Sequence, residues 1–190
     1  MSRAPSRRVR AAFFNMYSEI YISLGSNSGD RHAMIGRAVC GLAEAFAHMD
    51  ATIKVAEPVA GPAVGFVSEN PFVNVGVLLS VRKSNAWTAA ELESLLDATQ
   101  AVERSISSMP HRNADGSYRD REIDIDIIAV DDVVYSSERL VLPHPRMRGR
   151  YFVLRPMVSL LPGWRHPATG LAVEDMLSEC GDTENHACAE

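Results

Sequence analysis

The chain has 190 residues, of which 46% are hydrophobic and 23% are charged, a composition typical of one soluble globular domain. This composition excludes a disordered or fibrous chain, and every apolar run is far shorter than the about 20 residues that span a bilayer. The 19 basic and 24 acidic residues give a net charge of −5, which argues against nonspecific nucleic-acid binding as the main function.

The two ends of the chain differ in charge from its centre. Residues 1–18 carry four arginines and no acidic residue, whereas residues 174–190 carry six acidic residues and no lysine or arginine. We expect a disordered extension over residues 1–18, a single domain over 19–178 and an acidic tail over 179–190. The three cysteines are odd in number and far apart in the sequence, which predicts a reducing compartment, the cytoplasm.

The first half of the domain predicts a strand, a helix and a second strand. Residues 20–24 alternate apolar and polar side chains, and a Gly-Ser-Asn turn follows them. Asp30 is placed to cap the next helix, which has an apolar stripe at helical spacing. The stripe consists of Ile35, Val39, Leu42, Phe46 and Met49. Residues 53–55 alternate again, and residues 57–71, with three prolines and two glycines, predict a long functional connection.

The second half begins with a long predicted strand over residues 72–81, in which the alternate residues from Val73 to Val81 are apolar. Thr88 and Glu91 fit a capping box that starts a second helix. Residues 105–119 contain Pro, Asn and Gly and are expected to be irregular.

Residues 123–130 predict the last strand of the core, and residues 133–135 a short strand that pairs with it across a two-residue turn. The resulting order of elements, βαββαβ, is typical of an α+β ferredoxin-like fold. We expect a mainly antiparallel sheet with both helices on one face and an open face that holds the active site. Residues 140–177 are expected to add a short helix-rich segment.

Asp124 and Asp126 lie two residues apart on this last strand, on the face opposite to three isoleucines. Two residues of strand rise separate them by roughly 6 to 7 Å, close enough for both carboxylates to bind one cation or two bridged cations. Hard oxygen ligands favour magnesium over softer metals. The competing interpretation is an ordinary solvated strand face.

Six arginines surround this pair in the sequence, and His144 lies between two prolines that restrain the backbone. Guanidinium groups beside a magnesium site are suited to binding a polyphosphate. The six are Arg121, Arg139, Arg146, Arg148, Arg150 and Arg155. The alternatives are surface arginines and a structural, hydrogen-bonded histidine.

Phe72 and Asn74 are expected on the same open face as the aspartates, because the residues that alternate with them form the core face. An aromatic ring and an amide suit a flat heteroaromatic substrate, which stacks on the ring and exchanges hydrogen bonds with the amide. A polar edge strand would show the same pattern.

Four ordered motifs carry a resemblance to a known family. They are Tyr21–Asn27, Pro71–Asn74, Asp120–Asp126 and Leu142–Met147, the last followed by Arg150–Leu154. Over most of residues 20–177 the chain resembles the 6-hydroxymethyl-7,8-dihydropterin pyrophosphokinase family, and four motifs in this order are highly specific. The resemblance implies a ferredoxin-like core and transfer of the β,γ-pyrophosphoryl group of ATP to the pterin hydroxymethyl oxygen, with release of AMP, in folate biosynthesis.

The resemblance also implies roles for individual residues around ATP. Two magnesium ions that bridge the ATP phosphates would be held by Asp124 and Asp126. The catalytic residues that bind phosphate charge would be Arg121, His144 and Arg150. The residues near the nucleotide would be Glu103 and Arg139, together with His144 and Arg150. The pterin would be held by Phe72 and Phe152, one ring on either side of it, and by Asn74 and Val59.

The segment before the aspartates departs from the family pattern. Many members carry Leu-Gly-Arg-x-Arg and then Arg-Trp-Gly-Pro-Arg there, whereas residues 106–112 of this chain read Ile-Ser-Ser-Met-Pro-His-Arg. Tyr118 is the candidate for the place of the tryptophan, as a substrate-binding residue, and either Arg112 or Arg119 for the missing catalytic charge. Phe72 stands where tyrosine is frequent, which keeps the stacking and loses a hydroxyl group.

Two interpretations compete with that of an active enzyme. A degenerate family member would bind ATP or pterin without efficient transfer, because the arginine segment is altered. A noncatalytic ferredoxin-like module would present aromatic side chains to single-stranded RNA, but the acidic pair and the net charge argue against it. We expect an enzyme with small-molecule substrates, without nucleic-acid or membrane partners, as a monomer or weak dimer.

Overall fold

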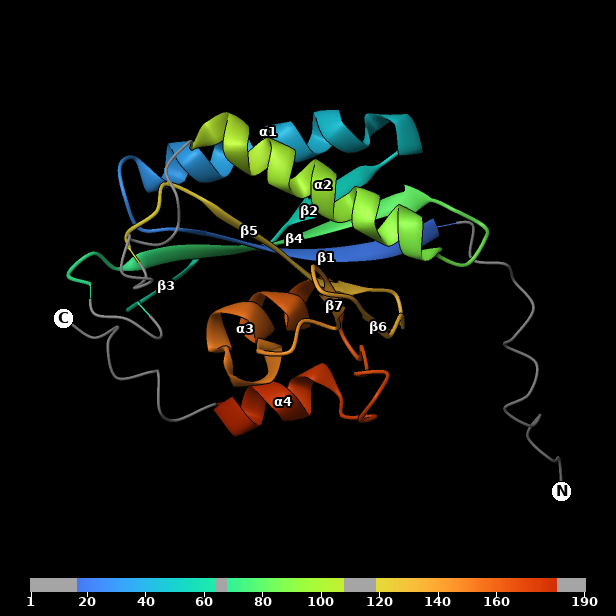
Figure 1. The fold of residues 1–190 in the computed structure, drawn as a ribbon. Helices are drawn as coiled ribbons and strands as arrows, with labels where there is room; N and C mark the ends of the chain where they lie inside the picture. Colours follow the sequence, from blue (N-terminus) through green and yellow to red (C-terminus); the bar gives the residue numbers. More distant parts are fainter. Residues whose placement is uncertain (1–16, 64–67, 108–118, 181–190) are drawn as a thin grey trace, which may run out of the picture.

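The structure is a computed structural model and describes residues 17–63, 68–107 and 119–180. Its centre is one antiparallel sheet in the strand order β2-β4-β1-β5, to which β3 adds by pairing with β4 (Figure 1). The strands are β1 (Tyr17–Ser26), β2 (Thr52–Val55), β3 (Val59–Gly61), β4 (Phe72–Arg82) and β5 (Asp124–Val130). This strand order confirms the ferredoxin-like core that the order of elements predicted.

Two long helices cover one face of the sheet, as Figure 1 shows. They are α1 (Arg31–Phe46), which a 3-10 turn η1 (Ala47–Met49) follows, and α2 (Ala89–Ile106). Both predicted caps are present. The Asp30 carboxylate accepts the Ala33 N–H at the start of α1, and Thr88 and Glu91 make a reciprocal capping box at the start of α2. The apolar faces of both helices and the alternate apolar residues of β1, β4 and β5 form the main hydrophobic core.

The opposite face of the sheet carries a second, smaller core. Helices α3 (Tyr151–Leu160) and α4 (Val173–Cys180), with the 3-10 turn η2 (Met147–Gly149), pack beneath it (Figure 1). The buried Tyr21 hydroxyl donates a hydrogen bond of 2.9 Å to the Val153 carbonyl. The sheet contributes Tyr21, Leu78, Ile128 and Ala129 to this core. The predicted helix-rich segment therefore covers part of the face that we expected to be open.

The short strand predicted over residues 133–135 does not pair with β5. Instead β6 (Tyr135–Ser136) pairs with β7 (Val141–Leu142) in a separate two-stranded sheet. The physical reason lies at Asp131, which has a positive φ of 44° and whose carboxylate accepts hydrogen bonds from the Ser18 hydroxyl and the Glu19 N–H. These contacts fix the end of β5 against β1, and the chain leaves the main sheet there.

The boundaries of the domain differ slightly from those expected. Strand β1 begins at Tyr17, so residues 17 and 18 belong to the sheet, and β3 lies inside the predicted connection 57–71. The first sixteen residues and the last ten lie outside the described residues. No helix in the described part of the chain is both long enough and apolar enough to span a membrane.

Gly76 allows α3 to pack closely against the sheet. A Cβ at this position would clash with the Tyr21 hydroxyl and would lie 2.7 Å from the Pro156 Cβ. We expect Gly76→Ala to lower the free energy of unfolding by about 1–3 kcal/mol through overpacking. The control is Gly36→Ala on the exposed surface of α1, where a Cβ meets nothing within 4 Å and alanine favours the helix. Urea unfolding that shows equal effects for the two variants would contradict this account.

The capping box of α2 should make the stability of the protein depend on pH. The Lys83 ammonium, 2.7 Å from the Glu91 carboxylate, and the bonds from Thr88 lower the pKa of Glu91 from its ordinary 4.5 to about 2. A carboxylate whose pKa is lowered by folding stabilises the protein fully above pH 4.5 and loses this contribution as the pH falls toward 2. The stability difference between the wild type and Glu91→Gln should therefore shrink over this range. Glu44→Gln, which removes a carboxylate from the exposed surface of α1 outside the capping box, is the control, and the same shrinkage in this variant would contradict the account.

Candidate active site

The register of the sheet brings three predicted site residues, Val59, Asn74 and Asp124, into one row. Val59 pairs with Asn74, Asn74 with Gly25 and Gly25 with Asp124, so the row crosses β3, β4, β1 and β5. The next row on the same face holds Gly76, Ser23 and Asp126. Because side chains alternate along a strand, Asn74, Asp124 and Asp126 lie on the face opposite to the main core, as predicted.

Gly25 keeps the middle of this row free of side chains. A Cβ there would lie 3.1 Å from the Asn74 side-chain oxygen and 3.6 Å from the Phe72 ring. Both Phe72 and Asn74 are buried, and the Asn74 amide donates a 3.4 Å hydrogen bond to the Val59 carbonyl. The structure thus brings Phe72, Asn74 and Val59 together, with the amide of Asn74 held in one orientation.

Each aspartate of the pair has an arginine partner. Arg121 Nη1 lies 2.6 Å from Asp124 Oδ2, and Arg150 Nη1 lies 3.6 Å from Asp126 Oδ2. The aspartate side chains stay 27% and 34% exposed, so a cation and its water ligands have access to them. Two carboxylates on one strand face are a donor set that magnesium accepts, because it usually takes one or two carboxylates and completes its shell with water and phosphate.

The same two arginines also lie over aromatic rings. The guanidinium carbon of Arg121 is 5.7 Å from the centre of the Phe72 ring, and that of Arg150 is 5.7 Å from the centre of the Phe152 ring. Each arginine therefore joins one carboxylate to one ring, an arrangement stabilised by charge on one side and by the π-face on the other. This places positive charge between the aromatic pair and the acidic pair.

Glu103 reaches β5 from α2. Its carboxylate accepts the N–H of Ile125, the residue between the two aspartates, at 2.7 Å. Burial raises the pKa of Glu103, and the nearby charge of Asp126 raises it further, while the Ile125 hydrogen bond lowers it. Glu103 thus supports the backbone of the aspartate strand, a contact that the sequence pattern did not indicate.

His144 lies on the same edge of β5. The backbone N–H of His144 donates to the Ile128 carbonyl at 2.7 Å, and its ring Nδ1 accepts the backbone N–H of Arg146 at 3.2 Å. Burial lowers the pKa of His144, as do the charges of Arg150 and Arg146, while Asp126 raises it. A neutral ring that accepts at Nδ1 carries its proton on Nε2, where it is a hydrogen-bond donor.

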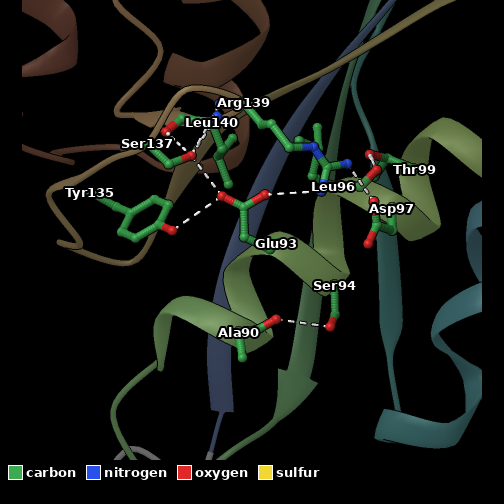
Figure 2. A network of polar contacts seen from close by, with 10 residues as sticks. All are labelled: Ala90, Glu93, Ser94, Leu96, Asp97, Thr99, Tyr135, Ser137, Arg139 and Leu140. Carbon is green, nitrogen blue, oxygen red and sulfur yellow. Dashed lines mark hydrogen bonds and ion pairs between the residues drawn. The ribbon is translucent and has the colours of Figure 1, made fainter.

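Arg139 lies in a different polar network, which Figure 2 shows. Its guanidinium is 3.2 Å from the Glu93 carboxylate and 2.5 Å from that of Asp97, both on α2. The Glu93 carboxylate also accepts hydrogen bonds from Tyr135 and Ser137. Glu93 precedes Glu103 by ten residues, which is about 15 Å along a helix. Arg139 therefore anchors the β6–β7 segment to α2 in this structure, and its nucleotide role stays a prediction.

Two predicted site residues, Arg112 and Tyr118, lie outside the described residues. A polar network at the end of β1 is not indicated by any pattern in the sequence. Asn27, Ser68 and Asn70 all donate hydrogen bonds to the carboxylate of Asp120. Asp120 stands in one of the four motifs, but its partners are 50 residues or more away in the sequence, so no local pattern indicates the contact.

Comparisons with known proteins indicate the family of the chain. The family model of 7,8-dihydro-6-hydroxymethylpterin-pyrophosphokinase (HPPK) matches residues 21–162. A 2-amino-4-hydroxy-6-hydroxymethyldihydropteridine pyrophosphokinase of Porphyromonas gingivalis is 37% identical over 150 residues, which are 78% of this chain and 93% of that protein. The protein of the same name from Bacillus subtilis is 31% identical over 141 residues, 74% of this chain and 76% of its own length.

Solved structures show the same fold at low sequence identity. A crystal structure of HPPK-DHPS in complex with substrates matches with a TM-score of 0.57 and 12% identity. The match covers 85% of this chain but only 43% of that longer chain, so this chain spans less than half of it. The family model and the relatives together show that the chain belongs to the 7,8-dihydro-6-hydroxymethylpterin-pyrophosphokinase family.

Proposed function

We propose that the protein transfers pyrophosphate from ATP to 6-hydroxymethyl-7,8-dihydropterin, giving the pterin diphosphate and AMP, in folate biosynthesis. The observation that carries the proposal is the pair of arginines, each between one carboxylate and one aromatic ring. This arrangement suits a reaction in which a stacked heteroaromatic substrate meets a polyphosphate. Family membership supports the same reaction.

The pterin would bind between Phe72 and Phe152. Flat heteroaromatic rings stack well on aromatic side chains, and an amide matches their alternating donors and acceptors. The Asn74 amide donates to the Val59 carbonyl, so its remaining donor and its oxygen have a fixed direction. Such preorganisation lowers the entropy cost of binding the ring in one orientation.

Asp124 and Asp126 would hold the magnesium ions, and their two-carboxylate donor set fits this hard cation. When bound, magnesium would neutralise phosphate charge and align the ATP phosphates. Arg121 and Arg150, which pair with the two aspartates in this structure, would then bind phosphate oxygens. His144 would donate from Nε2 to the same charge.

The reaction would proceed by positioning and charge stabilisation. The pterin hydroxymethyl oxygen forms a bond to the β-phosphorus of ATP, the bond between that phosphorus and the bridging oxygen on the α-phosphate breaks, and AMP leaves with the electron pair. The hydroxyl proton passes to solvent or to a phosphate oxygen. Arg121 and Arg150 would stabilise the negative charge that develops on the transferred group.

Two further expectations belong to this proposal. Substrates are small molecules, ATP and the pterin, rather than nucleic acid, because the site face carries carboxylates that repel a phosphodiester backbone. A cytoplasmic location and a monomeric or weakly dimeric state stay predictions from the sequence.

The proposal is tested by incubating the protein with the pterin, ATP and magnesium and measuring AMP. We expect AMP only when the pterin is present, and loss of AMP when magnesium is chelated with EDTA and its return when magnesium is added back. Binding of either substrate in calorimetry without AMP would favour the degenerate, binding-only member of the family. Binding of single-stranded RNA with no binding of either substrate would favour the RNA-binding module instead.

The role of the acidic pair predicts the effect of one substitution. Asp126→Asn keeps the size of the side chain and removes the charge, so we expect AMP formation to fall about 100-fold or more, as with loss of one preorganised electrostatic contact. The magnesium concentration for half-maximal rate should rise as well. Asp132→Asn, exposed beyond the other end of β5, is the matched control. Unchanged activity of Asp126→Asn would show that this carboxylate does not hold magnesium.

A further inference from the structure

Three loop or strand ends meet at the carboxylate of Asp120. Oδ1 accepts hydrogen bonds of 2.6 Å from the Asn27 amide and of 2.6 Å from the Ser68 hydroxyl. Oδ2 accepts one of 2.6 Å from the Asn70 amide. We call Asn27, Ser68, Asn70 and Asp120 the carboxylate hub.

The hub joins the segments that lead into the candidate site. Asn27 follows the end of β1, Asn70 lies two residues before Phe72 at the start of β4, and Asp120 lies four residues before Asp124 at the start of β5. Arg121, the next residue, pairs with Asp124 and lies over the Phe72 ring. The hub is therefore the polar link between the strand that begins with the aromatic residue and the strand that begins with the acidic one.

The two sides of the hub are anchored differently. The Arg121 side has its own bonds to Asn27, since the Arg121 N–H donates to the Asn27 side-chain oxygen at 2.8 Å and the Asn27 N–H donates to the Arg121 carbonyl at 3.1 Å. Asn27 is buried, so these bonds are shielded from water. Ser68 and Asn70 bond to each other, since the Asn70 N–H donates to the Ser68 hydroxyl at 3.1 Å. Apart from their bonds to Asp120, the contacts between these two residues and the ends of β1 and β5 in the described part of the chain are 3.4 Å contacts from the Asn27 amide.

We propose that Asp120 is a positioning residue for the pterin side of the site, which holds the segment before Phe72 against the ends of β1 and β5. Asp120 touches no reacting atom in this role and acts through Ser68 and Asn70. The inference rests on the proposed function, because it names the pterin as the ligand whose binding depends on the hub.

The charge state of Asp120 supports this role. The hydrogen bond from Ser68, and then those from Asn70 and Asn27, hold the pKa of the Asp120 carboxyl below its usual range, and the Arg121 charge lowers it further. An ionised carboxylate accepts all three bonds at once and makes each of them charge-assisted, whereas protonation removes the charge and weakens the acceptor oxygens.

The test is steady-state kinetics with AMP as the product. We expect Asp120→Ala, which removes all three hydrogen bonds of the hub, to raise the KM for the pterin about tenfold or more, because the loss of even one hydrogen bond to a charged group has an effect of this size. The kcat value and the KM for ATP should change little, because the bonds between Asn27 and Arg121 remain. Asp132→Ala, which removes the same charge at an exposed position, is the matched control.

An exchange of donor and acceptor tests the geometry and does not depend on the alanine variant being folded. Asp120→Asn keeps Oδ1 as an acceptor but replaces the charged Oδ2 with an amide, so the contact with Asn70 loses its charge assistance even when the Asn70 amide rotates to accept, and the pterin KM should rise. Adding Asn70→Asp restores one donor and one acceptor at this contact and should return the KM most of the way to that of the wild type.

Each outcome has one meaning. An active wild type, a raised pterin KM in Asp120→Asn and its recovery in the exchanged pair support the inference. An active wild type whose pterin KM is unaffected by Asp120→Asn, or a raised KM that the exchange does not lower, overturns it. A lower apparent kcat with both KM values unchanged would also overturn it, since this result indicates only a smaller folded fraction of the variant. A wild type that forms no pterin-dependent AMP contradicts the proposed function instead.

Discussion

The position of β1 between β4 and β5 is the constraint on which the rest of the structure depends. Its antiparallel pairing with both neighbours puts Gly25 opposite Asn74 on one side and opposite Asp124 on the other. A shift of one residue in either register would turn the aspartates or the amide into the hydrophobic core. The apolar residues of β1 that face α1 and α2 therefore fix the site as firmly as any polar contact within it.

The parts of the fold that depend on local patterns could be predicted from the sequence. Asp30 and the pair Thr88 and Glu91 cap their helices because their side chains bond to backbone groups only three residues away. The shared face of Phe72, Asn74 and the aspartates also follows from the alternation of side chains along strands. The order of elements then restricts the topology to a few arrangements, and the ferredoxin-like one is found.

The parts that depend on contacts distant in sequence could not be predicted in this way. β6 pairs with β7 because the contacts of Asp131 with Ser18 and Glu19 end the main sheet there. Asp131 lies 113 and 112 residues from these two partners in the sequence. Packing of α3 on the second face requires the missing side chain of Gly76, and a lone glycine in a strand does not indicate which element it meets. The contacts of Arg139 with α2 and of Glu103 with the Ile125 N–H are likewise set by tertiary packing.

The contacts along β5 have a consequence for solubility. This strand lies at the edge of the sheet, and unpaired N–H and C=O groups on such an edge are a template for adding a strand of another molecule. The Ile125 N–H is occupied by the Glu103 carboxylate, and the Ile128 carbonyl by the backbone of His144. The side chain of Glu103 thus also occupies a backbone donor at the edge of the sheet, which leaves one group fewer for pairing with a strand of another molecule.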